Sequence, residues 1–185
     1  MKKSYQKLIT ISSATLMGLL SFLSVFATAY ASPITSENVF HLINDERTVR
    51  GISPLRLNSD LDNAALNKSK DMLHRNYFEH FAHGLKPWDF ISLAGYNYMY
   101  AGENLAMKFE TSEGMISAWM NSPKHRDNIL SPEFEDIGIG IVKGEFTDID
   151  GSRGQTILVT NMFGRKTPVI LEVFNRFIEN IRIFF

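Results

Sequence analysis

The chain has 185 residues, of which 44% are hydrophobic and 21% are charged, and this composition is typical of globular domains and not of disordered chains. Its 19 Lys and Arg residues nearly balance its 20 Asp and Glu residues, so a nucleic-acid partner is not expected. There is no cysteine, which excludes disulfides and thiolate metal sites and leaves the packed core as the source of stability.

The N-terminal segment has the pattern of a secretory signal. Lysines at positions 2, 3 and 7 precede an uncharged apolar run over residues 8–30 that ends in Ala29-Tyr30-Ala31. We predict a signal peptide over residues 1–31, cleaved after Ala31. An uncleaved anchor is the alternative, because the run is long enough to cross a bilayer. An export signal without cysteine predicts a secreted or cell-envelope protein of a bacterium.

Apolar spacing, capping residues and Gly/Pro positions predict the elements that follow. We expect helices over residues 36–50, 59–75 and 86–93 and from residue 112 through Trp119, a turn starting at Pro123, an extended linker over residues 54–57 and a strand over residues 96–106. Thr35 or Ser36, Asn58 or Ser59, and Thr111 or Ser112 are the candidate N-caps.

Two later segments favour β-structure. Residues 136–142 place isoleucine at alternate positions, and residues 156–162 follow a loop that contains Asp150-Gly151, so we predict an antiparallel hairpin. Asp148 and Asp150 superficially resemble the start of a calcium loop. Val159 stands where such a loop needs a bidentate glutamate, so a plain turn is expected.

The last segment, residues 169–185, carries apolar residues on one helical face and polar residues on the other. We predict a C-terminal amphipathic helix. It could dock on the domain, which we favour, pair with a second copy, or lie in a membrane interface.

Candidate chemistry lies in His80, Glu103 and His125, which belong to three separate segments flanked by apolar residues. Two imidazoles and a carboxylate are ligands that zinc accepts with an open fourth position, where a water molecule can be polarised. Spacing alone does not show that they converge, because scattered His and Glu residues usually serve as surface groups or hydrogen-bonded structural residues.

The sequence around these residues is more specific. Five strings occur in order: Phe78-Glu79-His80, Ala94-Gly95-Tyr96, Ala101-Gly102-Glu103-Asn104-Leu105-Ala106, the stretch from Trp119 to Leu130 that includes Ser122-Pro123-Lys124-His125-Arg126, and Phe134 followed by Ile137-Gly138-Ile139-Gly140. Over about residues 39–164 the chain resembles the bacterial form of the CAP or SCP superfamily, which includes cysteine-rich secretory proteins, antigen 5 and pathogenesis-related protein 1. We assign this domain to residues 36–164.

The resemblance implies an α+β fold, a three-layer α-β-α sandwich with a central antiparallel sheet and a cleft lined by two histidines and two acidic residues. His80 matches the first cleft histidine, Glu103 the motif glutamate and His125 the second histidine. Ser122 stands where eukaryotic members have the second acidic residue. We expect Asn104 and Ser122 to line the same cleft, and Asn104 and Asn128 to bond backbone groups around it or to end local elements.

Loss of that carboxylate weakens any cation site, because it removes negative charge and one acid/base group. Glu113 and Asp127 are the nearest substitutes in the sequence, although Glu113 fits better as a favourable charge at a helix N-terminus. His83 could add a ligand, but an exposed loop histidine is the simpler interpretation.

The other motif residues have structural interpretations. We expect Trp119 and Phe134 to anchor the core. Gly138 and Gly140 leave one face of a strand without side chains, where a helix or a ligand can approach closely.

Three functions follow as hypotheses. The first is an exported binding module whose cleft takes a small ligand, lipid or peptide, with a divalent cation such as zinc on His80 and His125 and no organic cofactor. The second is a metal-assisted, peptidase-like hydrolase with Glu103 as general base. The third is a structural envelope protein that contacts a membrane, a partner or itself through the tail helix. We favour binding over catalysis, because no His-Glu-x-x-His helix, Gly-x-Ser-x-Gly elbow or cysteine nucleophile is present.

Overall fold

The computed structural model describes residues 31–168 together with residues 170, 171, 173 and 178. The described residues from Ser32 onwards belong to one compact unit. The predicted signal peptide, apart from Ala31, and most of the predicted tail helix over residues 169–185 lie outside the described residues. Within the described part, none of the helices combines the length and the apolar character that a membrane span requires.

Residues 32–168 form five helices and four strands. The helices are α2 (Ser36–Thr48), α3 (Ser59–Arg75), α4 (Pro87–Leu93), α5 (Ser112–Asn121) and α6 (Pro123–Leu130). The strands are β1 (Arg56–Leu57), β2 (Tyr98–Met107), β3 (Asp136–Thr147) and β4 (Arg153–Lys166). The predicted helices are therefore present, the predicted turn at Pro123 is a helix of eight residues, and both hairpin strands are longer than predicted.

Local side-chain bonds set the helix ends. Thr35, Asn58 and Thr111 each accept a backbone N–H of the first turn and so act as the N-caps of α2, α3 and α5. Asn76 adopts a left-handed backbone conformation (φ 54°) and ends α3. The sequence therefore encodes where these helices begin and where α3 ends.

The sheet has the strand order β1-β3-β4-β2. β4 pairs antiparallel with β2 and with β3, which confirms the predicted hairpin. β1 pairs parallel with β3, through Arg56 and Leu57 opposite Asp136 and Ile137. The sheet is therefore mixed, and the predicted antiparallel pairing holds for β2, β3 and β4 but not for β1. Residues 54–57 were predicted as a linker, because a two-residue strand is too short to show an alternating pattern. The long connection from β1 to β3 permits the parallel pairing.

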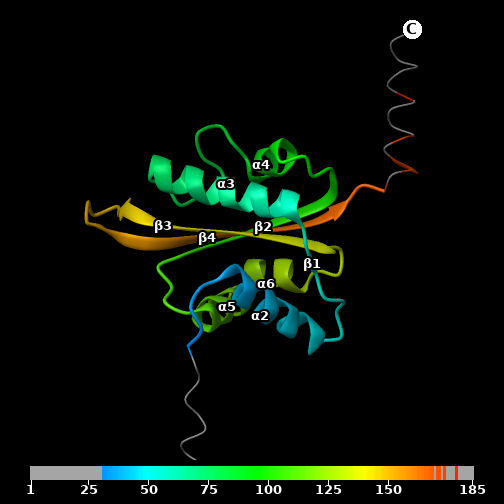
Figure 1. Ribbon diagram of the computed structural model, residues 1–185, viewed down its shortest axis with the longest axis horizontal. Coiled ribbons are helices and arrows are strands. Elements are labelled where there is room, and N and C mark those ends of the chain that lie inside the picture. The colour runs from blue at the N-terminus through cyan, green and yellow to red at the C-terminus, as the bar shows by residue number, and fades with distance from the viewer. Residues whose placement is uncertain (1–30, 169, 172, 174–177, 179–185) are drawn as a thin grey trace, which may run out of the picture. The chain divides into compact units, whose positions relative to one another are not determined.

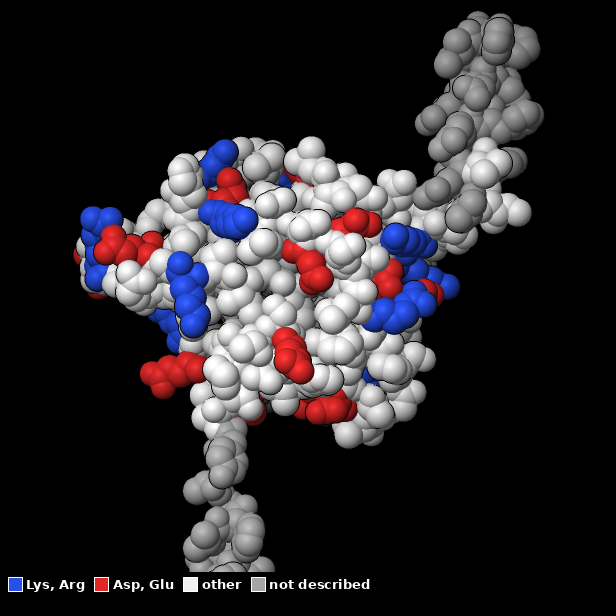
Figure 2. Space-filling view, viewed as in Figure 1, with Lys and Arg blue, Asp and Glu red and all other residues white. Residues whose placement is uncertain are grey.

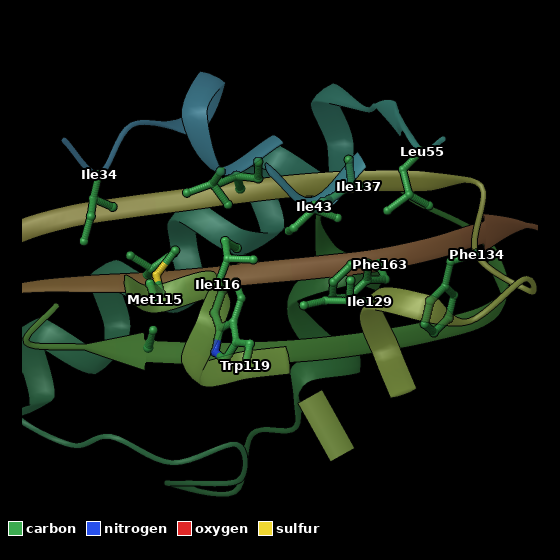
Figure 3. Packing of buried hydrophobic residues seen from close by; sticks show 14 residues of the cluster. Ile34, Ile43, Leu55, Met115, Ile116, Trp119, Ile129, Phe134, Ile137 and Phe163 are labelled. Carbon is green, nitrogen blue, oxygen red and sulfur yellow. The ribbon is translucent and has the colours of Figure 1, made fainter. Parts of the chain in front are cut away.

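Helices cover both faces of this sheet, which gives the three layers (Figure 1). α3 and α4 lie on one face, and α2, α5 and α6 lie on the other. The larger hydrophobic cluster fills the second interface, where Trp119 and Phe134 are buried among Met115, Ile129 and Phe163 (Figure 3). The prediction that Trp119 and Phe134 anchor the core is confirmed.

The backbones of α3 and β3 approach each other closely. A Cβ atom added at Gly138 would overlap the backbone of Leu61, and one added at Gly140 would overlap the backbone of Ala65. The hydroxyl of Ser69 also donates a 3.0 Å hydrogen bond to the carbonyl oxygen of Gly140. The close approach predicted for these glycines is therefore made by a helix, and α3 lies directly on the strand.

We expect Gly138→Ala to lower the free energy of unfolding by about 3 kcal/mol, because the new methyl group meets helix backbone, which cannot move aside as a flexible side chain can. Urea denaturation measures the change. Gly154→Ala in β4 is the matched control, since a Cβ there meets no atom within 4 Å. Equal stability of the two variants would contradict this account of the α3 contact.

Candidate functional site at the edge of strand β2

The residues predicted to form the site come together at β2, the edge strand of the sheet. Glu103 lies on β2, His80 lies in the connection between α3 and α4, and His125 lies on α6. Since α3 with α4 and α6 cover opposite faces (Figure 1), the two histidines reach this edge from the two helix layers. We call His80, Glu103, Asn104, Ser122 and His125 the histidine site.

His80 and Glu103 form the central pair of the histidine site. The Nδ1 atom of His80 lies 2.6 Å from Oε1 of Glu103. The glutamate side chain is 2% exposed, whereas the histidine side chain is 44% exposed. Within the described part of the chain, the buried Oε2 of Glu103 has no hydrogen-bond partner. The pair thus combines an accessible imidazole with a buried carboxylate that has one free oxygen.

Burial sets the electrostatics of Glu103. Desolvation raises the pKa of its carboxyl above the usual range, while the hydrogen bond with His80 and the positive charge of Lys68 lower it in part. A raised pKa makes this carboxylate a better proton acceptor than an ordinary glutamate, which is the property that a general base needs.

Lys68 supports the His80 segment from beneath, a role that was not predicted. The residue is fully buried, and its ammonium group donates to the carbonyl oxygens of Glu79 (2.9 Å) and His80 (3.1 Å) and to the hydroxyl of Tyr77 (3.3 Å). Burial lowers the pKa of Lys68, and the charge of Glu103 opposes this most strongly. The sequence signal for this role was the position of Lys68, which lies on the face of α3 that otherwise carries mainly apolar residues.

His125 is held by its own neighbours on the chain. Its Nδ1 lies 2.8 Å from the hydroxyl oxygen of Ser122, and its ring stacks on that of Trp119 at a centroid distance of 6.5 Å. Desolvation lowers the pKa of His125, and the nearby charge of His80 adds to the effect. The imidazole is therefore favoured in its neutral form, which is the form that binds metal ions.

Two asparagines fix α6 against β2. Asn104 is fully buried and donates to the carbonyl oxygen of His125 at 3.0 Å. Asn128 donates to the carbonyl oxygen of Glu103 (3.0 Å) and to the side-chain oxygen of Asn104 (2.9 Å). The expected bonding of backbone groups by both asparagines is thus observed, and it sets the position of His125 relative to Glu103.

Among the described residues, no hydrogen bond or ion pair joins the other candidate ligands to the histidine site. Glu113 accepts the backbone N–H of Ser32 at 3.0 Å, at the start of α5. Asp127 is exposed on α6. His83 is exposed and packs edge-on against the ring of Tyr77. The position of the missing carboxylate is therefore filled by Ser122 alone.

Metal-ligating groups are sparse in the described region. Among residues 31–168 and the four described tail residues, no cluster of three or more His, Cys, Asp or Glu side chains is arranged to hold an ion. A cavity of about 590 Å³ is lined by residues of α2, α3, β1 and β3 and not by the histidine site. The candidate cation ligands of the histidine site are therefore the imidazoles of His80 and His125.

Comparison with known proteins agrees with the residue motifs. A family model described as the cysteine-rich secretory protein (CAP) family matches residues 40–159. The uncharacterized protein YkwD of Bacillus subtilis (strain 168) is 42% identical over 109 residues, which are 58% of this chain and 42% of YkwD. The chain thus spans less than half the length of this relative.

Solved structures share the fold. An extracellular protein containing an SCP domain from Bacillus anthracis is 26% identical, with a TM-score of 0.59 over 74% of this chain and 45% of that protein. An outer surface protein from Borrelia burgdorferi, at 20% identity and a TM-score of 0.58, covers 74% of this chain and 99% of its own. The second similarity concerns the fold alone.

We expect Lys68→Met to lower the free energy of unfolding by about 2 kcal/mol, because the carbonyl oxygens of Glu79 and His80 lose the donor that Lys68 supplies from inside the protein. The same change should alter the environment of the His80 ring, which NMR of the imidazole signals detects. Lys70→Met is the control, since Lys70 is exposed on the same helix. A destabilised protein with an unchanged His80 signal would show that Lys68 does not position this segment.

The raised pKa of Glu103 predicts a pH dependence of stability. The folded protein holds this proton more tightly than the unfolded chain, so the free energy of unfolding should fall as pH rises from the ordinary pKa of a glutamate to the raised value. Glu103→Gln should remove this slope, measured by urea denaturation over roughly pH 4 to 8. Glu110→Gln makes the same charge change at an exposed position and should leave the slope unchanged. A slope that survives in Glu103→Gln would assign it to another group.

Proposed function

Because the chain belongs to the cysteine-rich secretory protein (CAP) family, we propose that it is an extracytoplasmic binding module that takes a small ligand, lipid or peptide at the histidine site. Relatives described as an extracellular protein and as a membrane protein support this location. The proposal rests on the hydrogen bonds of the two imidazoles. The Nδ1 atom of the accessible His80 is paired with Glu103, and that of the half-buried His125 is paired with Ser122. Beside them, Oε2 of Glu103 has no donor among the described residues.

The hydrogen bonds leave the same atom free on each ring. When Glu103 is ionised, its oxygen accepts the Nδ1 proton of His80, and the Nε2 lone pair of the neutral ring is free. A Nδ1–H bond from His125 to the hydroxyl oxygen of Ser122 has the same consequence. Outer partners that fix the tautomer in this way are typical of metal-binding histidines.

A divalent cation such as zinc fits this donor set as a weakly held ion. His80 and His125 would hold it through Nε2, Glu103 and Ser122 would orient the rings, and the bound ligand or water would supply the remaining positions. When bound, such an ion polarises a carbonyl or carboxylate group of the ligand.

A metal-assisted hydrolase is the second candidate. It is favoured by one feature, the buried Glu103 with its raised pKa beside an exposed imidazole, which suits a general base. Here Glu103 would accept a proton through its free oxygen while His80 keeps the carboxylate in place. Binding remains our first proposal, because it needs no reaction from these residues.

Zinc titration of the purified protein tests the ion site by calorimetry. We expect one ion per chain, and a loss of affinity of about tenfold or more in His80→Ala/His125→Ala. Ser122→Ala should weaken zinc binding by about tenfold, because it removes the hydroxyl that bonds Nδ1 of His125 and orients its ring. His41→Ala is the control, because it changes an exposed histidine of α2 that lines the other cavity. Unchanged zinc binding in the double variant would overturn the site.

A screen of peptide and ester substrates with added zinc separates the two candidates. The binding proposal predicts no turnover, whereas the hydrolase predicts turnover that Glu103→Gln reduces by about a hundredfold or more, the usual effect of losing a general base.

A further inference from the structure

The opposite edge of the sheet is open. β1 pairs with β3 only at Asp136 and Ile137. From Gly138 to Thr147, no other strand formed by residues 31–168 lies on that side of β3. An uncovered strand edge of this kind presents unpaired N–H and C=O groups.

Side chains of α3 and its C-cap close the two ends of this open edge. Asp62 accepts the N–H of Ile139 through Oδ1 at 2.8 Å. Asn76 bonds both backbone groups of Thr147, accepting its N–H at 2.7 Å and donating to its carbonyl oxygen at 2.8 Å. The side chains of Asp62 and Asn76 therefore occupy backbone hydrogen-bonding positions that a neighbouring strand would otherwise use.

Between these two positions the backbone groups remain available. Alternate residues of a strand direct their N–H and C=O groups to the same side, so Ile141, Lys143 and Glu145 face outward with Ile139 and Thr147. No hydrogen bond from another described residue reaches the outward backbone groups of these three residues. An extended backbone laid along this edge would bond all three residues at once.

A cavity of about 590 Å³ lies along the same edge. Its apolar lining residues are Phe40 of α2, Leu57 of β1, Leu66 of α3, and Ile139 and Ile141 of β3, and its polar ones are Ser36, Glu37, His41, Asp62 and Asn63. In Figure 2, which views this face, uncharged residues occupy most of the centre. We call this cavity with the open edge the β3 groove.

The two formally charged residues that line the cavity are acidic, whereas Lys143 lies on the open edge beside it. Glu37 is exposed on α2, Asp62 is half-buried on α3, and both line the cavity. Acidic side chains lie within this face, whereas Lys and Arg side chains gather towards its two ends (Figure 2). The groove is thus complementary to basic side chains next to apolar ones.

We propose that the β3 groove binds an extended peptide of alternating apolar and basic residues, which adds a strand to β3 between Asp62 and Asn76. Backbone hydrogen bonds to Ile141, Lys143 and Glu145 align the peptide with β3, and an apolar side chain of the peptide enters the cavity. This site goes beyond the proposed function, because it lies on the edge of the sheet opposite to the histidine site.

A synthetic peptide, Lys-Val-Lys-Val-Lys with blocked ends and a fluorescent label, is the probe. Fluorescence anisotropy with the full protein should show saturable binding. The same peptide methylated on alternate amide nitrogens keeps its charge but loses donors, and should bind at least about tenfold more weakly, the effect of two lost hydrogen bonds. Glu-Val-Glu-Val-Glu should not bind.

Variants of the protein make the matched test. Lys143→Pro removes one outward N–H and should weaken binding about fivefold or more, since proline is tolerated where an edge N–H faces solvent. Lys143→Ala keeps the N–H and should bind as well as the wild type or better. Glu37→Gln should weaken binding about threefold, as expected for an exposed charge pair.

NMR amide shifts locate the peptide and separate this inference from the proposed function. Shifts confined to residues 139–145 and α2 support the β3 groove. Shifts at His80 and His125 instead would place the peptide at the histidine site and overturn the inference while supporting the first proposal. Equal affinity for the methylated and unmethylated probes, or no binding of either, would also overturn it.

Discussion

The contact of α3 with β3 determines the arrangement of both sheet edges. Gly138 and Gly140 let the helix backbone lie directly on the strand, which fixes the rotation of α3 about its axis. One face of the helix then points Lys68 beneath the His80 segment, and another face points Asp62 at the outer edge of β3. A side chain on either glycine would move both at once.

The histidine site depends on polar bonds made inside the protein. Lys68 holds the His80 segment through main-chain carbonyl oxygens, and Asn104 holds α6 through the carbonyl oxygen of His125. Each of these donors is fully buried, where an unpaired polar group would cost more than a hydrogen bond returns. The site is therefore rigid at its base, while the His80 ring stays accessible.

Sequence reasoning predicted most of the fold because its signals were local. Thr35, Asn58 and Thr111 marked helix starts, and the alternating isoleucines of residues 136–142 marked the hairpin. It missed β1, whose two residues pair with a strand about 80 positions later, since no local pattern encodes a parallel partner. The signal peptide and the tail helix remain predictions.

For the site, the resemblance pointed to His80, Glu103 and His125, and the structure brings them to one edge. Spacing could not reveal the role of Lys68, because its partners are main-chain atoms of another segment. Nor could it show that Ser122 bonds the ring of His125, since that bond depends on how α5 ends and α6 begins.

Replacing a carboxylate by Ser122 changes what the histidine site can hold. The negative charge of Glu103 is opposed by the ammonium group of Lys68, and Ser122 adds none, so the site supplies little net charge to attract a cation. Two imidazoles would bind an ion through lone pairs alone and would leave most of its charge uncompensated. An anionic group on the ligand would supply the missing charge. On the proposal made above, an ion and an anionic ligand would bind together more tightly than either would alone.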